Sequence, residues 1–468
     1  MIVKQLKPWE DNKMKSKFIK KLLSSVLALT IVASMAACGS STESADSTAA
    51  VSSSVAEESK PAEPVTLKIF STSPDRATGV GKLEDDIAAK YKAENPNVTI
   101  EFEALQDEPY KQKFKAYTAS NSLPDIFMVW GQSAFFGPVM KGGYAAELNT
   151  ADYADYKFVN GTLDGYSQDG KLYGLPRNLD TMLLLYNKAM FDDNGLKVPT
   201  TYAELLEVSK AFRAKGIAPL AMTGKDKWPL GILYQDLVLK LSGNQKLIYD
   251  AMDGKTTFAA EADLLKAAQM VQEMADAKVF QDAFTASDYG AANNLFAQEK
   301  AAMYYMGSWT MNMAGDTNFS EHFRQNVGAT YFPVIDGGKG TAGDALAWCG
   351  AGYAVSEKSA NKAEAIKLLN YMMKPENSAK LSWETGAQVP AQDYSAFMTG
   401  KENQLQTQIT ALIASAKTTS ALPCWYDNST PAMKTDGENL SQKLAAKQLT
   451  PEQFLAECDK AATAARGK

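Results

Sequence analysis

The feature that most constrains the fold is an alternation of strand and helix patterns in the first part of the chain. Apolar residues alternate along residues 65–69, as on a strand, and recur every four residues along 83–91, as on one face of a helix. Strands that alternate with helices predict a parallel sheet and therefore an α/β fold. Ligands of such sheets bind beyond the carboxyl ends of the strands, so we expect the loops after Phe70 and Val129 to border a site.

The 468-residue length predicts more than one folded lobe, because a single core stops growing well before that size. Residues 1–37 have the parts of a secretory signal peptide: lysines, a short apolar run and small residues before a cut. The lysine-rich region begins at its own methionine, so we expect translation to start at Met14.

Cys38 follows Ala36 and Ala37 directly and thereby resembles the lipidated cysteine of a bacterial lipobox, with Met35 where leucine is usual. An ordinary signal peptide with an incidental cysteine is the alternative. The remainder of the stretch 38–64 is serine, alanine and glutamate without an aromatic residue, which predicts a disordered tether behind the lipidated cysteine.

The charge balance argues against nucleic acid as a partner. The chain carries 48 basic and 54 acidic side chains, and removal of residues 1–37 takes away seven lysines but only two acids. A phosphate backbone requires a basic face, which this balance does not favour.

Cysteine and histidine usage limits the chemistry. Beyond Cys38 only Cys349, Cys424 and Cys458 remain, so either Cys349 and Cys424 form a disulfide or both are free buried thiols. Cys458 lies on a helical pattern and is expected to pack in the core. The single histidine, His322, excludes a multi-histidine metal centre, and we expect no metal and no cofactor.

Residues 170–196 contain the most informative local pattern. A turn and a Gly174/Pro176 interruption precede an apolar run at 182–186, which predicts a buried strand. Arg177 and Asp180 stand at the interruption. The stretch is therefore a candidate hinge that carries polar groups.

Four blocks give the chain a resemblance to the family 1 extracellular solute-binding proteins, the maltose-binding-protein-like lipoprotein receptors of bacterial sugar ABC transporters. The sequence departs from the family at 386–390, GAQVP, where Gly-x-x-Pro is frequent. The blocks are LPDI at 123–126, GKLYGLP at 170–176 with YNK at 186–188, FAQEKAAM at 296–303 with MGSW at 306–309, and GAGYAVS at 350–356 with LL at 368–369.

The resemblance implies a two-lobe, periplasmic-binding-protein-like α/β fold of class II, with the ligand cleft between lobes joined by crossing strands. The crossings would fall within 170–196, near 348–352 and near 386–390. Lobe 1 would comprise residues 65–175 plus 350–385, and lobe 2 residues 176–349 plus 386–468.

The resemblance also implies a function without catalysis. The protein would capture a carbohydrate, an oligosaccharide, and deliver it to the permease subunits of an ABC transporter. It would act as a monomer on the extracellular face of the bacterial cytoplasmic membrane, anchored by lipid at Cys38. The alternatives are a secreted glycoside hydrolase, which needs only two opposed carboxylates, and a receptor for a non-sugar solute such as a peptide or polyamine.

A sugar presents hydroxyl groups and C–H faces, which carboxylates, amides, arginine and flat aromatic rings recognise. By resemblance, Trp309 and Trp425 are the best stacking candidates and Asp180 matches an acidic crossing position. Core packing is the other reading for each tryptophan, and a solvated or salt-bridged loop carboxylate is the other reading for Asp180. The predicted sugar-binding side chains are Asp75, Arg76, Trp130, Gln132, Arg177, Asp180, Trp228, Trp309, Asp344, Trp348, Trp383 and Trp425.

Overall fold

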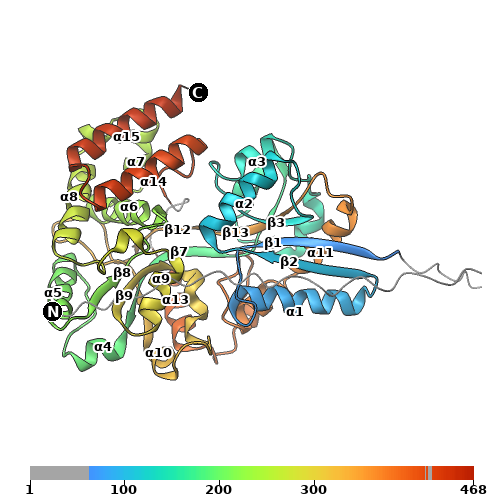
Figure 1. Cartoon of the computed structure of the whole chain (residues 1–468), viewed down its shortest axis with the longest axis horizontal. Coiled ribbons are helices and arrows are strands. Elements are labelled where there is room, and N and C mark those ends of the chain that lie inside the picture. Colours follow the sequence, from blue (N-terminus) through green and yellow to red (C-terminus); the bar gives the residue numbers. More distant parts are fainter. Residues whose placement is uncertain (1–62, 417, 420–423, 468) are drawn as a thin grey trace, which may run out of the picture. The chain divides into compact units, whose positions relative to one another are not determined.

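The computed structural model describes residues 63–416, 418–419 and 424–467. The predicted signal peptide, Cys38 and most of the tether therefore lie outside the described residues. Within them the chain forms two five-stranded sheets, each with its own helices (Figure 1). The α/β class expected from the alternating patterns is confirmed.

The first sheet has the strand order β2-β1-β3-β13-β6. β1 runs parallel to both of its neighbours, whereas β13 runs antiparallel to β3 and β6. The predicted parallel sheet therefore exists for its first three strands. The bounds are β1 Val65–Ser71, β2 Val98–Ala104, β3 Ile126–Trp130, β6 Leu175–Pro176 and β13 Ala351–Val355.

Helices cover both faces of this sheet. Figure 1 shows α2 and α3 on one side and α1 on the other. One apolar cluster joins these helices to the strands, with Leu83 and Ile87 of α1 and Tyr110 and Phe114 of α2 among its members. The bounds are α1 Gly79–Glu94, α2 Asp107–Ala119, α3 Gly137–Lys141, α11 Lys362–Met373 and α12 Ala379–Glu384.

The second sheet has the order β10-β7-β9-β8, and β12 pairs with the early part of β7. The apolar run at 182–186 lies inside β7, where every residue from Asp180 to Leu185 is buried. The predicted buried strand is therefore confirmed. The bounds are β7 Leu179–Asn187, β8 Ala218–Ala221, β9 Ala301–Gly307, β10 Val327–Thr330 and β12 Ala347–Cys349.

The helix α6, Trp228–Ser242, is the centre of the second apolar cluster. Almost all of its residues are buried, as expected of a helix that is apolar on every side. Two of its charges are also buried: Asp236 accepts a bond from Tyr305, and Lys240 donates to the Asp344 carbonyl. The other helices that accompany the second sheet are α4 Lys188–Asp193, α5 Tyr202–Ala214, α7 Leu247–Met252, α8 Ala262–Asp276, α9 Tyr289–Ala297, α10 Glu321–Asn326, α13 Gln404–Ser415, α14 Pro431–Ala445 and α15 Pro451–Arg466. Of these, α9, α10 and α13 pack in a separate apolar cluster.

The chain passes between the two sheets at 176–179, at 349–351 and at 384–389. Backbone hydrogen bonds join the three passages: Arg177 N donates to Ala351 O at 2.8 Å, and Leu179 N donates to Val389 O at 2.9 Å. Backbone hydrogen bonds therefore hold the three passages side by side. The lobe boundaries predicted from the resemblance, at 175/176, 349/350 and 385/386, stay a prediction.

The three described cysteines, Cys349, Cys424 and Cys458, are free thiols. The Cys349–Cys424 disulfide is therefore absent, and the free-thiol alternative holds. Cys349 instead points its sulfur at the Thr162 carbonyl, 3.2 Å away. Cys458 is fully buried in the apolar cluster around α6, as its helical position predicted.

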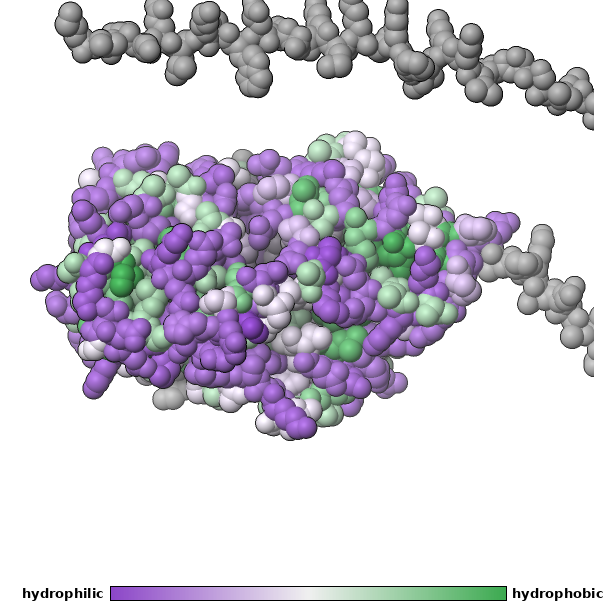
Figure 2. Space-filling view, turned by 60° about the horizontal axis from the view of Figure 1, so that its bottom comes forward, coloured by the Kyte–Doolittle hydropathy of each residue, from purple (hydrophilic) through white to green (hydrophobic). Residues whose placement is uncertain are grey.

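The face of the molecule seen in Figure 2 is mostly polar. Hydrophilic side chains dominate it, and the apolar ones are scattered in small groups. Among the described residues only Val159 and Met398 are large apolar side chains with high exposure. A search of the described helices finds none with the length and apolar character needed to cross a bilayer.

We call the part of the molecule that carries the first sheet the first half, and the part that carries the second sheet the second half. Trp425 tests the packing of the second half. Its ring is 1% exposed and lies 5.2 Å from the Phe258 ring, among the apolar side chains around α6. We expect Trp425→Ala to lower the free energy of unfolding by about 3 to 5 kcal/mol, because it leaves a large cavity. Urea denaturation followed by circular dichroism measures this change. Trp425→Phe should recover part of the loss, and a wild-type midpoint for the alanine variant would contradict this packing role.

Candidate functional site

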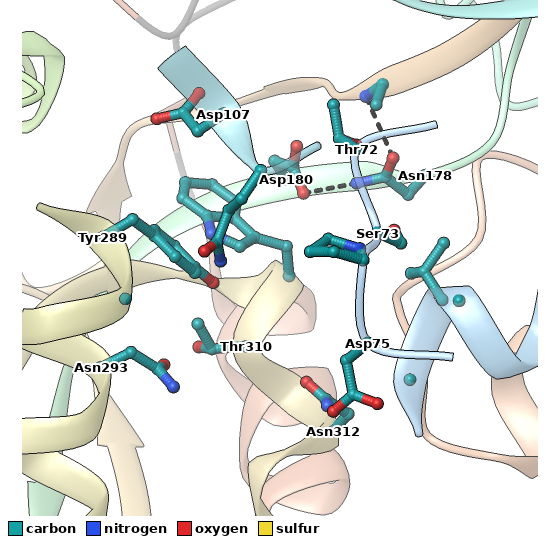
Figure 3. A pocket seen from close by; sticks show the side chains of 18 of the residues that line it. Thr72, Ser73, Asp75, Asp107, Asn178, Asp180, Tyr289, Asn293, Thr310 and Asn312 are labelled. Atoms are coloured by element: carbon teal, nitrogen blue, oxygen red, sulfur yellow. Dashed lines mark hydrogen bonds between the residues drawn. The ribbon is translucent and has the colours of Figure 1, made fainter. Parts of the chain in front are cut away.

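A cleft of about 560 Å³ lies where the two sheets and the passages between them meet (Figure 3). Its walls combine polar side chains with a row of indole rings. The lining residues used below are Thr72, Ser73, Asp75, Thr78, Asp107, Lys111, Trp130, Gln132, Arg177, Asn178, Asp180, Trp228, Tyr289, Asn293, Trp309, Thr310, Asn312, Asp316, Asn318, Trp348, Asp427 and Lys434.

The loop after β1 supplies one wall of the cleft. Thr72, Ser73 and Asp75 follow the carboxyl end of that strand directly and line the cleft. Gln132 follows β3 in the same way. The edge of the sheet expected from strand direction is thus the edge that borders the cleft.

Three neighbouring tryptophans whose rings are tilted to one another line the cleft from the side of the second sheet. The ring centroids of Trp228 and Trp309 are 5.8 Å apart, and those of Trp309 and Trp348 are 6.0 Å apart. Trp130, from the end of β3, lines the cleft from the first half and packs edge-on against Phe135. The cleft therefore has flat apolar surface contributed by both halves.

Asp107 connects the two halves at one end of this surface. Its Oδ2 accepts a hydrogen bond from the Trp228 indole N–H across the cleft, at 2.8 Å, and its Oδ1 pairs with Lys111 Nζ at 2.9 Å. Asp107 has a backbone φ of 31°, in the left-handed region that disfavours residues other than glycine. Strain of this kind persists where surrounding contacts hold it, as these two do.

Two further hydrogen bonds cross the cleft at its other end. Thr78 Oγ1 donates to Asp316 Oδ2 at 3.2 Å, and Asn318 Nδ2 donates to Asp75 Oδ2 at 3.3 Å. The cleft is therefore bordered on both sides by contacts between the two halves.

Asp180 is a buried carboxylate in the lining of the cleft. Asn178 Nδ2 donates to its Oδ1 at 2.6 Å, whereas its Oδ2 has no hydrogen-bond partner among the described residues. A Cβ at position 350 would lie 2.3 Å from that Oδ2, so Gly350 is required there. Burial raises the pKa of the Asp180 carboxyl to about 7, although the Arg177 charge and the Asn178 bond act in the opposite direction.

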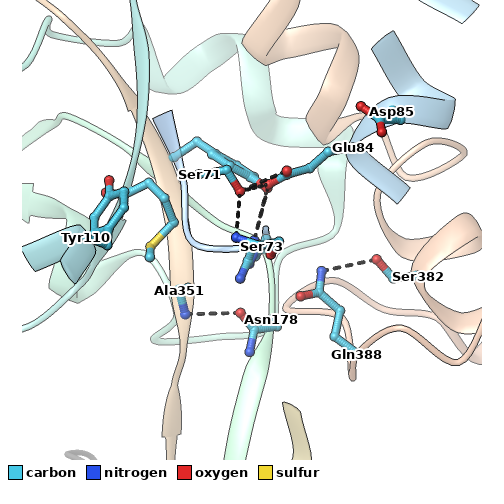
Figure 4. Close-up of polar contacts among 12 residues, drawn as sticks. Ser71, Ser73, Glu84, Asp85, Tyr110, Asn178, Ala351, Ser382 and Gln388 are labelled. Atoms are coloured by element: carbon cyan, nitrogen blue, oxygen red, sulfur yellow. Dashed lines mark hydrogen bonds and ion pairs between the residues drawn. The ribbon is translucent and has the colours of Figure 1, made fainter. Parts of the chain in front are cut away.

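A buried carboxylate holds Arg177 beside Asp180. Glu84 is 2% exposed and accepts hydrogen bonds from Ser71 Oγ at 2.8 Å and from the Tyr353 hydroxyl at 2.5 Å (Figure 4). Arg177 Nη1 lies 3.1 Å from the same hydroxyl and 3.6 Å from Glu84 Oε1. The buried Glu84 and Tyr353 side chains thus position the guanidinium, and Arg177 still lines the cleft.

The structure brings eight of the twelve predicted site residues together. They come from loops and strand ends that are far apart in the sequence. The eight that line the cleft are Asp75, Trp130, Gln132, Arg177, Asp180, Trp228, Trp309 and Trp348.

Arg76 and Asp344, which were predicted as sugar-binding residues, are not among the residues that line the cleft. Arg76 pairs with Glu84 and Asp85 at 2.5 and 2.6 Å, so its guanidinium stabilises the start of α1. Asp344 accepts a bond from the Thr341 backbone N–H at 2.5 Å, within its own loop.

Trp383 and Trp425 are likewise placed in the core and away from the cleft lining. The Trp383 ring stacks on Tyr394 at 4.5 Å, and its indole N–H donates to Glu402. Trp425 packs among aromatic rings around α6, although Cys424 and Asp427 beside it do line the cleft. For these two tryptophans the structure favours the core-packing alternative over ligand contact.

Several lining residues were not predicted from the sequence. Asn178 stands two residues before Asp180 in the same passage and has the amide chemistry that a sugar site needs, so its position was a usable signal. Asp107 and Tyr289 begin helices α2 and α9, and an acidic residue in the first turn of a helix, such as Asp107, is common on helix-dipole grounds alone. The other lining residues that the sequence analysis did not predict include Thr72, Ser73, Asn293, Thr310, Asn312 and Asp316.

Comparison with known proteins gives a consistent assignment. A model of the bacterial extracellular solute-binding protein family matches residues 77–379. The chain is 25% identical to the multiple sugar-binding protein of Streptococcus mutans over 336 residues, which cover 69% of this chain and 74% of that protein.

Two solved structures are similar over nearly their whole length. One comes from work on xylan utilization by the thermophilic bacterium Caldanaerobius polysaccharolyticus, with a TM-score of 0.76, 30% identity, and coverage of 84% of this chain and 99% of that one. The other is a chitin oligosaccharide binding protein, with a TM-score of 0.76, 25% identity, and coverage of 86% and 100%.

Asp180 makes the stability depend on pH. The folded-state pKa, about 7, exceeds the ordinary carboxyl value of 3.8, so between these values the folded protein binds a proton that the unfolded chain releases. This contribution to stability is lost as the pH rises through 7. Asp180→Asn carries no such charge, and its melting temperature relative to wild type should increase from pH 5 to pH 8.

Thermal unfolding across that pH range measures the difference. Asp193→Asn, which alters an exposed carboxylate at the end of α4, is the matched control and should differ from wild type by the same amount at each pH. A difference between Asp180→Asn and wild type that does not change with pH would contradict the proposed protonation.

Proposed function

We propose that this chain, which belongs to the bacterial extracellular solute-binding protein family, captures an oligosaccharide and delivers it to the permease of an ABC transporter. The family consists of binding proteins, so the chain is not an enzyme. The secreted glycoside hydrolase considered from the sequence is therefore set aside.

The observation that carries the proposal is the pairing of the tryptophan row with polar side chains in one cleft. Indole faces pack against the C–H faces of sugar rings, and Trp228, Trp309 and Trp348 supply a row of such faces. Asp180 Oδ2 and the lining amides supply acceptors and donors for hydroxyl groups. The Streptococcus mutans relative is named for sugar binding and one structural neighbour for chitin oligosaccharides, which supports the same ligand class.

Capture requires the two halves to open and close around the ligand. Residues of both halves line the cleft, so a sugar bound there contacts both at once. A ligand that makes more contacts in the closed form than in the open form shifts the population toward the closed form. The three hydrogen-bonded passages are the places where the backbone would bend, and the closed form would then dock on the permease.

The proposed lobes follow from the resemblance and from the two sheets. Lobe 1 would comprise 65–175 plus 350–385 and carry the first sheet. Lobe 2 would comprise 176–349 plus 386–468 and carry the second sheet. The tryptophan row would then belong mainly to lobe 2, and Asp75, Asp107 and Trp130 to lobe 1.

Trp309 tests the ligand assignment. A thermal-shift screen with xylotriose, chitotriose and galactotriose should identify a sugar that binds the wild type. Calorimetry should then show that Trp309→Ala weakens binding by about 1 kcal/mol or more, the scale of one lost aromatic contact. Trp309→Phe, which keeps a ring, should lose less. Equal affinity of the alanine variant and the wild type would remove Trp309 from the site.

We also propose that Cys38 is lipidated and holds the protein at the extracellular face of the cytoplasmic membrane as a monomer, with 38–64 as a tether. This proposal rests on the sequence alone. In a bacterial host, wild-type protein should be found in the membrane fraction with Cys38 as its modified first residue by mass spectrometry. Cys38→Ala should leave the folded domain intact but shift it out of the lipid-modified fraction. An unmodified Cys38 in mature protein would contradict the anchor.

A further inference from the structure

We infer that the cleft selects its ligand by charge, accepting uncharged sugars and rejecting anionic ones such as uronic acids. The inference rests on the proposed function and narrows its substrate class. It follows from the way charges in the cleft are paired: every cation there already has a carboxylate partner, whereas several carboxylates have no cation.

Two lysines line the cleft, and each is held by two acids. Lys111 Nζ lies 2.9 Å from Asp107 and 2.6 Å from Glu108. Lys434 Nζ lies 2.6 Å from Asp427 and 3.1 Å from Glu438. A ligand carboxylate would therefore have to compete with two existing partners at either lysine.

Arg177 is the third cation in the lining, and buried side chains contact its guanidinium. Its Nη1 lies 3.6 Å from the buried Glu84 carboxylate and 3.1 Å from the Tyr353 hydroxyl. The side chain is only 10% exposed. Glu84 thus offsets part of the guanidinium charge from within the protein, although the Arg177 Nε has no hydrogen-bond partner among the described residues.

Three carboxylates in the lining have only neutral hydrogen-bond donors. Asp180 accepts from Asn178, Asp316 accepts from the Thr78 hydroxyl, and Asp75 accepts from the Asn318 amide. None of the three has a cationic nitrogen within 4.0 Å in the described part of the chain. No described cation pairs with these carboxyl groups, and their oxygens can accept bonds from hydroxyl groups.

A uronate placed in this cleft would face those carboxylates without a free cation to pair with. Like charges brought together in a partly buried site repel strongly, because water screens them less there. A neutral sugar meets the opposite situation, since its hydroxyl groups donate to carboxylates through charge-assisted bonds. The same groups that hold a neutral sugar would therefore exclude its acidic counterpart.

Matched pairs of sugars test the selectivity in the wild-type protein. The pairs are galactotriose with trigalacturonate, xylotriose with glucuronic-acid-substituted xylotriose, and chitotriose with its form oxidised at the primary hydroxyl groups. For the pair whose neutral member binds, calorimetry should show affinity for the anionic member at least about tenfold lower, the size of one unfavourable charge contact. The gap should narrow as salt is raised, because salt screens the repulsion.

Two substitutions should weaken the exclusion without touching the cleft wall. Glu108 and Glu438 are absent from the lining, so Glu108→Gln and Glu438→Gln each free one lysine from one of its partners. The double variant should bind the anionic sugar several-fold more tightly and the neutral sugar with less than about a twofold change. Glu457→Gln, which breaks a surface pair with Lys460 on α15, has the charge change of either single variant and should alter neither affinity.

The outcomes separate this inference from the proposed function. Equal or tighter binding of the anionic member by wild type would overturn the charge selection and leave sugar binding standing. A double variant that changes both affinities by the same factor would also overturn it, because the effect would then be structural. Failure of every neutral and anionic sugar to bind would instead overturn the proposed function, and the inference with it.

Discussion

The backbone pairing of the passages between the sheets is the constraint on which the site depends. Gly350 N donates to Asn178 O at 2.8 Å, and the neighbouring bonds from Arg177 and Leu179 fix the three passages in one register. Because position 350 has no side chain, the Asp180 carboxylate can lie directly against it. These hydrogen bonds thus place the Asp180 carboxylate in the lining of the cleft, at the passages where we propose that the backbone bends.

The walls of the cleft extend this arrangement to both halves. One half contributes strand-end loops and the other a row of indoles, and Asp107 links them by accepting the Trp228 N–H. Acids outnumber free cations in the lining, because Lys111 and Lys434 are each neutralised by two carboxylates. The shape and the charge of the cleft therefore favour the same class of ligand, because the lining offers flat apolar surface to the faces of sugar rings and unpaired acceptors to their hydroxyl groups.

Local patterns predicted the parts of the molecule that local physics determines. Period-two and period-four apolar spacing identified the strands and many of the helices, and strand direction identified the edge of the sheet that borders the cleft. Trp383 and Trp425 were predicted as site residues, whereas both rings pack in the core. A position in a loop or at a helix end does not reveal where a ring points. Trp425 is buried by Phe258, more than 150 residues away in the sequence. Asp107 was missed because its partner, Trp228, comes from the other half of the molecule.

The most direct test of the account is a crystal structure of the protein with the sugar that binds it most tightly. The account predicts a sugar ring packed on Trp309 and a sugar hydroxyl that donates to Asp180 Oδ2, with contacts from both halves. A sugar bound elsewhere, with Trp309 and Asp180 free of contact, would contradict it.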